Sequence, residues 1–263
     1  MTTRKILWFL LFTVAALTVS VSCSGDDDNG GMTIPDIDKT LNRQGTGTSA
    51  RDLLSAEKYS RIILEIVYVQ GYEPNATSVN NLKSFISERM HKPGAIDVEM
   101  TQIAPPGNTE YSVDDVFELE KEVRTKYNND DQIAVFAFFA DKGSTENEDN
   151  KVVLGAAYLN TSFVIYESTI REISARSDTP SRTVMESTVI QHEFGHLLGL
   201  VNLGTDLTSD HQDEANGHHC DVQDCLMYYQ AETGGNISDV ITGGTIPELD
   251  PQCIADLQAN GGK

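Results

Sequence analysis

The sequence predicts an α/β domain built on a mixed, mostly parallel twisted sheet. Short runs of β-branched and other apolar residues, such as residues 133–140 (IAVFAFFA), indicate strands that are covered on both faces. Segments in which apolar residues recur at helical spacing separate several of these runs. The resulting order, βαβαβββα, is typical of a sheet with helical crossovers between parallel strands.

The first three elements follow from apolar patterning. Residues 62–69 (IILEIVYV) are almost continuously apolar and predict a strand buried on both faces. A helix is expected over residues 78–90, and its helically spaced apolar positions are Val79, Leu82, Phe85 and Ile86. Residues 96–103 alternate between apolar and polar, which predicts a second strand.

A capped helix and the central strand come next. Ser112 is a suitable N-cap for a helix over residues 112–127, and Val116, Leu119 and Val123 fall on one face of it. Residues 133–140 are the most strongly apolar run of the body and are expected at the centre of the sheet.

Two short strands and two helices complete the body. Strands are expected near residues 152–158 and 163–166, on either side of a turn at Asn160. A long helix is expected over residues 183–200, and a short one near residues 251–257.

The composition excludes two classes of partner. The 263 residues include 19 Lys and Arg against 40 Asp and Glu, which gives a net charge of −21. Such a chain repels phosphate backbones and cannot dock on anionic lipid through basic patches. With 39% hydrophobic and 22% charged residues, it has the composition of a globular protein.

The N-terminal segment predicts export. Arg4 and Lys5 precede an apolar run at residues 6–21, as in a secretory signal. The segment ending at Cys23 resembles a bacterial lipobox, in which this cysteine is lipidated, and residues 24–28 resemble the acidic export tag of surface lipoproteins. An ordinary cleaved signal or an uncleaved anchor is the alternative.

This segment divides the chain into three parts. We expect a signal peptide at residues 1–22, a flexible acidic tether at 23–45 and a catalytic domain at 46–263. The expected location is the outer membrane, at the cell surface, through the lipid anchor.

The chemistry lies on the long helix, in residues 192–196 (HEFGH). His192 and His196 are four residues apart, so they share a helix face and can hold one Zn²⁺. Glu193 lies one step around the helix, where it suits a general base. A surface helix with scattered histidines explains the apolar context of residues 188–200 poorly, because buried ionisable groups need a partner.

This motif resembles the signature of the metzincin metallopeptidases. In that family a glycine follows three residues after the second histidine, as Gly199 does here, and a third metal ligand follows three residues later. The glycine ends the helix in a tight turn. The third position in this sequence is Asn202, whose amide is a poor zinc ligand.

A second block, residues 218–229 (HHCDVQDCLMYY), resembles that of archaemetzincins, in which the third histidine precedes Cys-x4-Cys-x-Met. The resemblance implies that His219 is the third ligand and that Met227 forms the Met-turn beneath the zinc, in a small C-terminal subdomain. The alternatives for the third ligand are His211, His218 and Asn202. Similar blocks occur in a group of bacterial surface lipoprotein metalloproteases.

Two further assignments follow from the resemblance and from local context. Tyr229 stands two residues after the methionine, where astacin-like and serralysin-like enzymes have a tyrosine that assists the oxyanion. Packing of the turn is the alternative for Tyr229 and for its neighbour Tyr228. His211 lies in residues 210–214 (DHQDE), which form either a solvated acidic loop or a Ca²⁺ site.

Cys220, Cys225 and Cys253 remain once Cys23 is lipidated. In an oxidising compartment we expect a disulfide, either Cys220–Cys225 or one of these with Cys253. Archaemetzincins use corresponding cysteines for a second, structural zinc together with a later CxxC. This chain has only Cys253 there, so one catalytic zinc is expected and the resemblance does not carry the second site over to this chain.

The predicted function is that of a monomeric zinc-dependent endopeptidase, a hydrolase of the cell envelope that acts on protein or peptide substrates. Glu193 is the expected general base, and the edge strand near residues 154–158 is expected to bind the substrate as an added strand. The alternative is a surface-anchored zinc-binding lipoprotein without turnover. The intact Glu193 argues against it, because a protein that only binds zinc needs no base.

Overall fold

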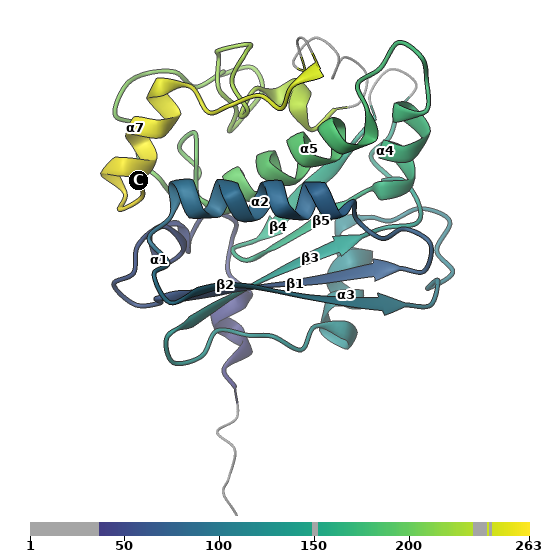
Figure 1. Ribbon diagram of the computed structural model, residues 1–263, viewed down its shortest axis with the longest axis horizontal. Coiled ribbons are helices and arrows are strands. Elements are labelled where there is room, and N and C mark those ends of the chain that lie inside the picture. The colour runs from purple at the N-terminus through teal and green to yellow at the C-terminus, as the bar shows by residue number, and fades with distance from the viewer. Residues whose placement is uncertain (1–36, 149–151, 234–240, 242–243) are drawn as a thin grey trace, which may run out of the picture. The chain divides into compact units, whose positions relative to one another are not determined.

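The computed structural model describes residues 37–148, 152–233, 241 and 244–263. The chain divides into two units, Met1–Asp36 and Ile37–Lys263, and the second is the folded body (Figure 1). The predicted signal peptide, Cys23 and the first part of the tether lie outside the described residues. Within the described part, no helix is long and apolar enough to cross a membrane.

A five-stranded sheet with the order β2-β1-β3-β5-β4 forms the centre of the body. Its strands are β1 (Arg61–Val69), β2 (Ala95–Ile103), β3 (Gln132–Phe139), β4 (Gly155–Leu159) and β5 (Ser162–Ile165). Neighbouring strands are parallel except for β4, which pairs antiparallel with β5 at one edge. The mixed, mostly parallel sheet predicted from the sequence is therefore confirmed, with β3 at its centre.

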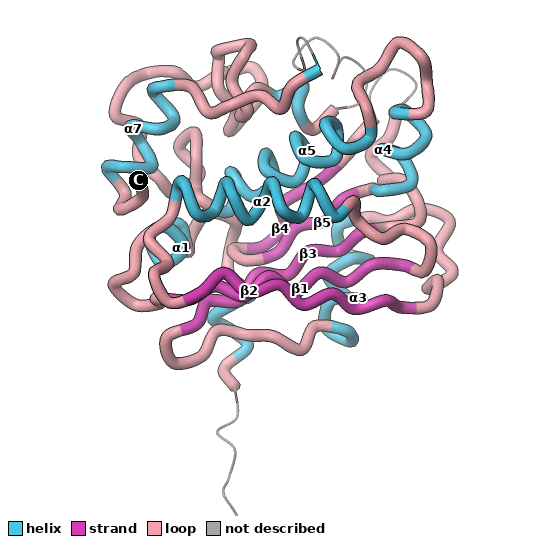
Figure 2. The backbone as a smooth tube through the Cα atoms, viewed as in Figure 1, coloured by secondary structure: helices cyan, strands magenta, loops and turns pink. Residues whose placement is uncertain are grey.

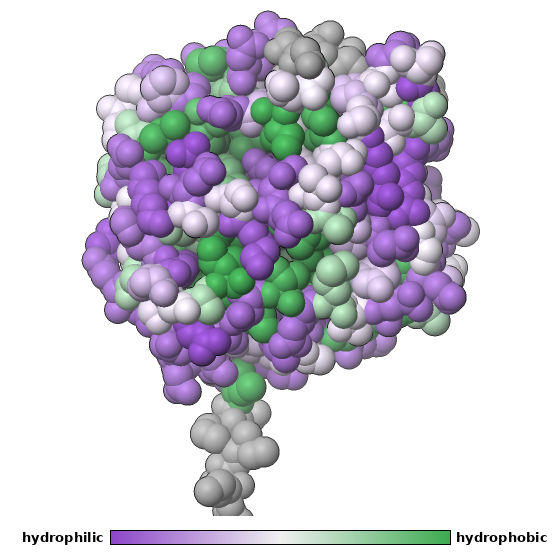
Figure 3. Space-filling view, in the orientation of Figure 1, coloured by the Kyte–Doolittle hydropathy of each residue, from purple (hydrophilic) through white to green (hydrophobic). Residues whose placement is uncertain are grey.

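Helices cover both faces of the sheet. They are α1 (Ala50–Leu54), α2 (Ala76–Arg89), α3 (Val113–Val123), α4 (Glu167–Ser174), α5 (Arg182–Leu197) and α7 (Pro251–Ala259), with 3-10 turns η1 (Lys39–Asn42) and η2 (Tyr229–Ala231). Figure 2 shows α2 and α5 side by side over one face, and α3 lies behind the sheet. The face seen in Figure 3 is mostly hydrophilic, as the acidic composition predicts.

The central strand supplies both layers of the core, which explains its continuous apolar sequence. Ile133, Val135 and Phe139 belong to the cluster that includes residues of α2 and α5. Phe136 and Phe138 belong to the cluster on the α3 side.

The helix predicted over residues 112–127 ends earlier, at Val123, although Ser112 caps it as expected. Beyond Val123 the backbone amides of Thr125 and Lys126 donate to the buried Glu65 carboxylate at 2.8 Å each. The side chain of Arg124 is buried and binds Glu120 and the Ala134 carbonyl. These buried polar contacts replace the last helical turn.

The folded body begins before residue 46, so the predicted end of the tether is wrong. Asn42 is fully buried, and its side-chain amide donates to Asn128 Oδ1 at 2.8 Å and to the Ala134 carbonyl at 3.0 Å. The Gln44 amide donates to Asn160 Oδ1 at 3.1 Å. Polar side chains hold this segment in place, so a search for apolar periodicity does not detect it.

Candidate metal centre and catalytic residues

Helix α5 holds the first two predicted zinc ligands inside the protein. Ser181 caps the helix, and residues 185–197 are all buried. The Nε2 atoms of His192 and His196 are 3.2 Å apart, as expected for residues one turn apart that point to the same place.

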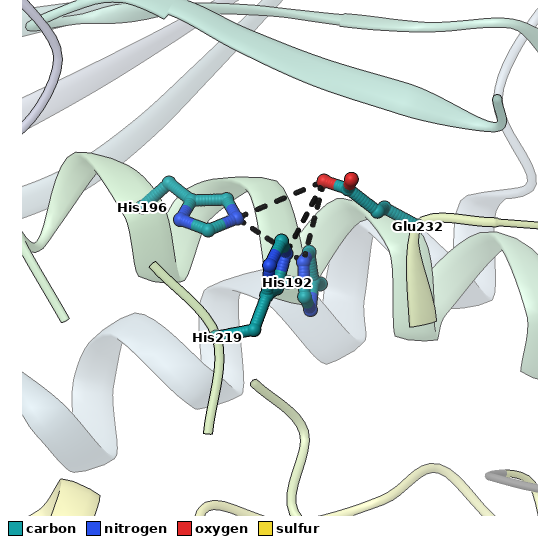
Figure 4. Close-up of side chains that lie close together, drawn as sticks. All are labelled: His192, His196, His219 and Glu232. Carbon is teal, nitrogen blue, oxygen red and sulfur yellow. Dashed lines mark hydrogen bonds and ion pairs between the residues drawn. The ribbon is translucent and has the colours of Figure 1, made fainter. Parts of the chain in front are cut away.

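Two further side chains complete the cluster (Figure 4). His219 reaches it from the loop after α5, at the position that the family resemblance implies. Glu232 follows η2, and its Oε2 lies 3.7 Å from His192 Nε2, 3.8 Å from His196 Nε2 and 3.5 Å from His219 Nε2. Glu232 was not predicted, because it is a single acidic residue in a segment without a recognisable motif.

The donor set fits Zn²⁺. Ligand atoms about 2.0–2.1 Å from a tetrahedral zinc lie about 3.3–3.4 Å from one another. The separation of His192 and His196 and the nearest separation of Glu232, 3.2 and 3.5 Å, are close to this value, and all four donor atoms lie within 4.8 Å of one another. The Nδ1 atoms of His192 and His219 lie 2.7 and 2.6 Å from the carbonyls of Leu226 and Asn216. A proton on each Nδ1 leaves Nε2 free as a ligand, which is the usual arrangement around bound metal.

Electrostatics at the cluster favour neutral imidazole at His196. Burial and the neighbouring His192 and His219 lower the pKa of His196 well below its ordinary value. Burial opposes ionisation of Glu232, but His192 and His219 lower its pKa overall. Burial opposes the charged form of His219, but the neighbouring Glu232 raises its pKa overall. Zinc requires neutral imidazoles, so binding of the metal would favour release of a proton from His219.

The other candidates for the third ligand lie elsewhere. His211 is buried against Asp256, with 3.2 Å between Nε2 and Oδ2. His218 Nδ1 lies 3.0 Å from the Val201 carbonyl, and the Asn202 side chain donates to Gln212 at 3.3 Å. None of the three belongs to the cluster with His192 and His196.

Glu193 is fully buried next to β4. A Cβ added at Gly155 would lie 2.7 Å from Glu193 Oε1, so the missing side chain leaves room for the carboxylate. Neither oxygen has a hydrogen bond of standard geometry within the described residues. Burial and the charge of Glu232 raise the pKa of Glu193 well above its ordinary value, and the Ala157 backbone offsets this only in part. A buried carboxyl group without a strong partner is a good candidate for a general base.

Two residues of the predicted motifs determine where α5 ends and what packs against it. Gly199 has φ of 71°, and a Cβ there would lie 2.8 Å from the Thr205 amide nitrogen, so this position ends the helix and needs glycine. Met227 is fully buried, and its Sδ occupies the space where Gly195 would carry a Cβ. Met227 therefore packs directly on the turn of α5 between the two histidines.

The Tyr229 hydroxyl accepts a hydrogen bond from Gln230 Nε2 at 3.1 Å. The rings of Tyr228 and Tyr229 are 4.8 Å apart. Both packing and a role at the oxyanion are compatible with this arrangement, and the second stays a prediction.

The predicted disulfide is wrong, because Cys220, Cys225 and Cys253 are free and buried. Together with Asp250 they place their donor atoms within 4.8 Å of one another. Cys225 Sγ lies 3.7 Å from Cys253 Sγ, and the backbone amides of Met227 and Asp250 lie 3.4 and 3.5 Å from Cys225 Sγ. Hydrogen bonds from Cys220 and Cys253 lower the pKa of Cys225. The three sulfurs converge on one point instead of forming a pair.

The predicted calcium site at residues 210–214 is not supported. Asp213 instead closes a turn, because its carboxylate accepts from the Ala215 amide at 3.0 Å and from the Asn216 side chain. In the part of the chain that the structure describes, the histidine and cysteine clusters are the groups that could hold a metal ion.

Comparison with known proteins shows a similarity in structure and none in sequence. No protein-family profile matches this chain, and no curated protein matches its sequence. Among solved structures, the chain is similar to an archaemetzincin from Methanopyrus kandleri, with a TM-score of 0.49 and 17% identity over 76% of this chain and 96% of that chain. At this level of similarity, the evidence for function is the geometry of the site residues themselves.

Proposed function

We propose that this protein is a zinc-dependent metallopeptidase, and specifically an endopeptidase. One observation carries the proposal: three histidines place their ring nitrogens within 4.8 Å of one another, beside the buried Glu193, which has no strong partner. His192, His196 and His219 would hold the metal, as in catalytic sites with three protein ligands.

The zinc ion, Glu193 and two backbone carbonyls have distinct roles in the proposed reaction. Bound zinc lowers the pKa of water and polarises a peptide carbonyl. Glu193 accepts the proton of the attacking water and passes it to the leaving amine, a role that suits a carboxyl group with a raised pKa. The carbonyls of Leu226 and Asn216 orient His192 and His219.

The sheet edge offers a place for an extended peptide. Strand β4 lies at the edge, and its residues after Gly155 are half-buried. A peptide that pairs with β4 as an added strand would pass close to Glu193, which lies against Gly155. This arrangement suits cleavage within an extended chain, and it supports an endopeptidase.

The cysteine cluster would hold a second zinc with a structural role. Cys220, Cys225, Cys253 and Asp250 supply four protein donors, and a site filled by protein ligands is typical of structural zinc. His211 Nε2, 4.0 Å from Cys253 Sγ, lies just outside this set.

The location of the enzyme is proposed from the N-terminal sequence. A lipid on Cys23 would anchor a monomer to the outer membrane, facing the cell surface, with the catalytic domain beyond the tether. Labelling with a fatty-acid analogue, with and without Cys23→Ala, tests the anchor.

The second candidate function is zinc binding without turnover. It is favoured by Glu232, because a fourth protein donor is typical of a closed, non-catalytic site.

Measurements of zinc content and of gelatin cleavage distinguish the metallopeptidase from the protein that only binds zinc. We expect the wild-type protein to bind zinc and cleave gelatin, and a chelator to abolish cleavage. Glu193→Gln should keep its zinc and lose cleavage, whereas Glu118→Gln, the same change at an exposed carboxylate on α3, should behave as the wild type. Zinc that is lost on His196→Ala shows that the histidine site is occupied. Such zinc without cleavage in every protein would favour the binding role, and its absence would contradict both.

A further inference from the structure

The backbone fixes Glu232 beside residues 153–154, which lead into β4. Its carbonyl accepts from the Leu154 amide at 2.8 Å, and Thr233 forms an antiparallel bridge with Val153. The Ala231 amide binds the Tyr228 carbonyl at 3.0 Å within η2. The side chain, and not the backbone, is therefore the part of Glu232 that is free to move.

The carboxylate is placed like a metal ligand and not like the partner of one histidine. A charged hydrogen bond would bring Oε2 to about 2.7–2.9 Å from one imidazole nitrogen. Instead Oε2 is nearly equidistant from three of them, at 3.5, 3.7 and 3.8 Å. Near-equal separations slightly above 3.3 Å are those of the fourth corner of a zinc tetrahedron.

A permanent fourth ligand would conflict with the rest of the site. It would occupy the position that a catalytic zinc keeps for water or substrate. Glu193 would then be a buried carboxyl group without a function, and burial of such a group is costly. An exchangeable fourth ligand removes the conflict.

Exposure identifies Glu232 as the member able to exchange. The His192 side chain is fully buried, whereas 26% of the Glu232 side chain is exposed. Rotation about its side-chain bonds would carry the carboxylate toward solvent. We infer that Glu232 is the fourth zinc ligand of the resting site, and that it withdraws when a peptide substrate binds.

The position of the segment supplies a means of release. Residues 232–233 pair with residues 153–154, directly before the edge strand β4. A peptide that pairs with β4 would therefore meet Glu232 at one end of the strand, so binding of substrate and binding of Glu232 to zinc compete. This inference rests on the proposed function and adds a form of self-inhibition to it.

The test measures access to the fourth position without relying on cleavage. Acetohydroxamate, a small zinc-binding anion, is titrated by calorimetry into the zinc-loaded wild type, Glu232→Gln and Glu232→Ala. Glu118→Gln is the matched control, since that carboxylate is 68% exposed on α3. We expect both Glu232 variants to bind acetohydroxamate at least about tenfold more tightly, because no protein ligand has to be displaced.

Two further measurements support this one. Competition with a fluorescent chelator should show zinc affinity at the histidine site falling about 10- to 100-fold in the Glu232 variants, while the cysteine cluster contributes equally to all the proteins. Gelatin cleavage at saturating zinc should rise. Unchanged affinity for acetohydroxamate in both Glu232 variants, or cleavage below that of the wild type, would overturn the inference.

The outcomes separate this inference from the proposed function. Tighter acetohydroxamate binding in proteins that never cleave peptides would keep Glu232 as a ligand and refute the protease. Cleavage by the wild type with unchanged acetohydroxamate binding would keep the protease and refute the role of Glu232.

Discussion

Gly155 lies against the carboxylate of Glu193, so that an added Cβ would be 2.7 Å from Oε1 and 2.8 Å from Cγ of the glutamate. The first residue of the edge strand and the proposed base therefore share one space. The same Cβ would lie 2.8 Å from Cγ1 of Val189. Because interiors are close-packed, one added methyl group must displace the strand or these side chains.

Gly155→Ala should reduce cleavage about 10- to 100-fold, since a displacement of about 1 Å at a catalytic group has effects of this size. Zinc content should not change, because Gly155 does not belong to the histidine cluster. Gly45→Ala is the matched control: the nearest atom to its added Cβ is 3.9 Å away. Equal cleavage by both variants would show that the position of Glu193 does not depend on Gly155.

The contact between Gly195 and Met227 makes a prediction about stability. Alanine at position 195 should favour the helix by about 1 kcal/mol, but its Cβ collides with Met227 Sδ. Overpacking of a core costs about 1–3 kcal/mol, so Gly195→Ala should lower the free energy of unfolding.

Removal of the sulfur should reverse the sign of this effect. In a Met227→Ala background the collision is absent, and Gly195→Ala should become neutral or stabilising. Urea unfolding of the two single variants and the double variant measures the coupling between the residues. Additive effects of the two changes would show that they do not compete for the same space.

Local patterns in the sequence predicted the sheet and the helix that carries His192 and His196 well. Strands β1, β3 and β5 are almost continuously apolar, whereas β2 alternates between apolar and polar residues. His192 and His196 are four residues apart on one helix, where spacing alone determines a shared face. The short helices α1 and α4 were missed, because they lack a long periodic pattern.

Residues that are distant in sequence were harder to place. His219 required a resemblance to a family, because it lies on a loop whose path no local rule determines. Glu232 gave no signal at all. The sequence predicts a disulfide because three thiols suggest one bonded pair and one free cysteine. In the folded protein Asp250 lies beside the three thiols and supplies a fourth possible metal ligand.

The cysteine cluster predicts two zinc ions per chain. Cys225→Ser should remove one zinc and lower the melting temperature, because a structural metal contributes directly to folding. His196→Ala should remove the other zinc with a smaller effect on melting. Elemental analysis and thermal unfolding of both variants provide reciprocal controls. A protein that contains one zinc, and whose three thiols react at once with a thiol reagent, would contradict the second site.

A buried carboxyl group away from the metal sites predicts how stability depends on pH. Glu167 lies at the start of α4, fully buried, and Arg171 and Arg182 both bind its Oε1. Burial and the charge of Glu186 raise the pKa of Glu167 to about 8 from 4.5. Between these values the folded protein holds a proton that the unfolded chain has released. Its contribution to stability is therefore complete below about 4.5 and is lost as the pH rises through about 8.

Glu167→Gln should abolish this contribution, because an amide does not titrate. The free energy of unfolding, measured in urea across this pH range, should fall more steeply with pH in the wild type than in the variant. Subtraction of the two curves removes the contribution of the histidines, which both proteins share. Glu172→Gln, at a 77% exposed position on the same helix, should keep the slope of the wild type. Parallel curves for the wild type and Glu167→Gln would mean that the two arginines outweigh burial and keep Glu167 ionised throughout.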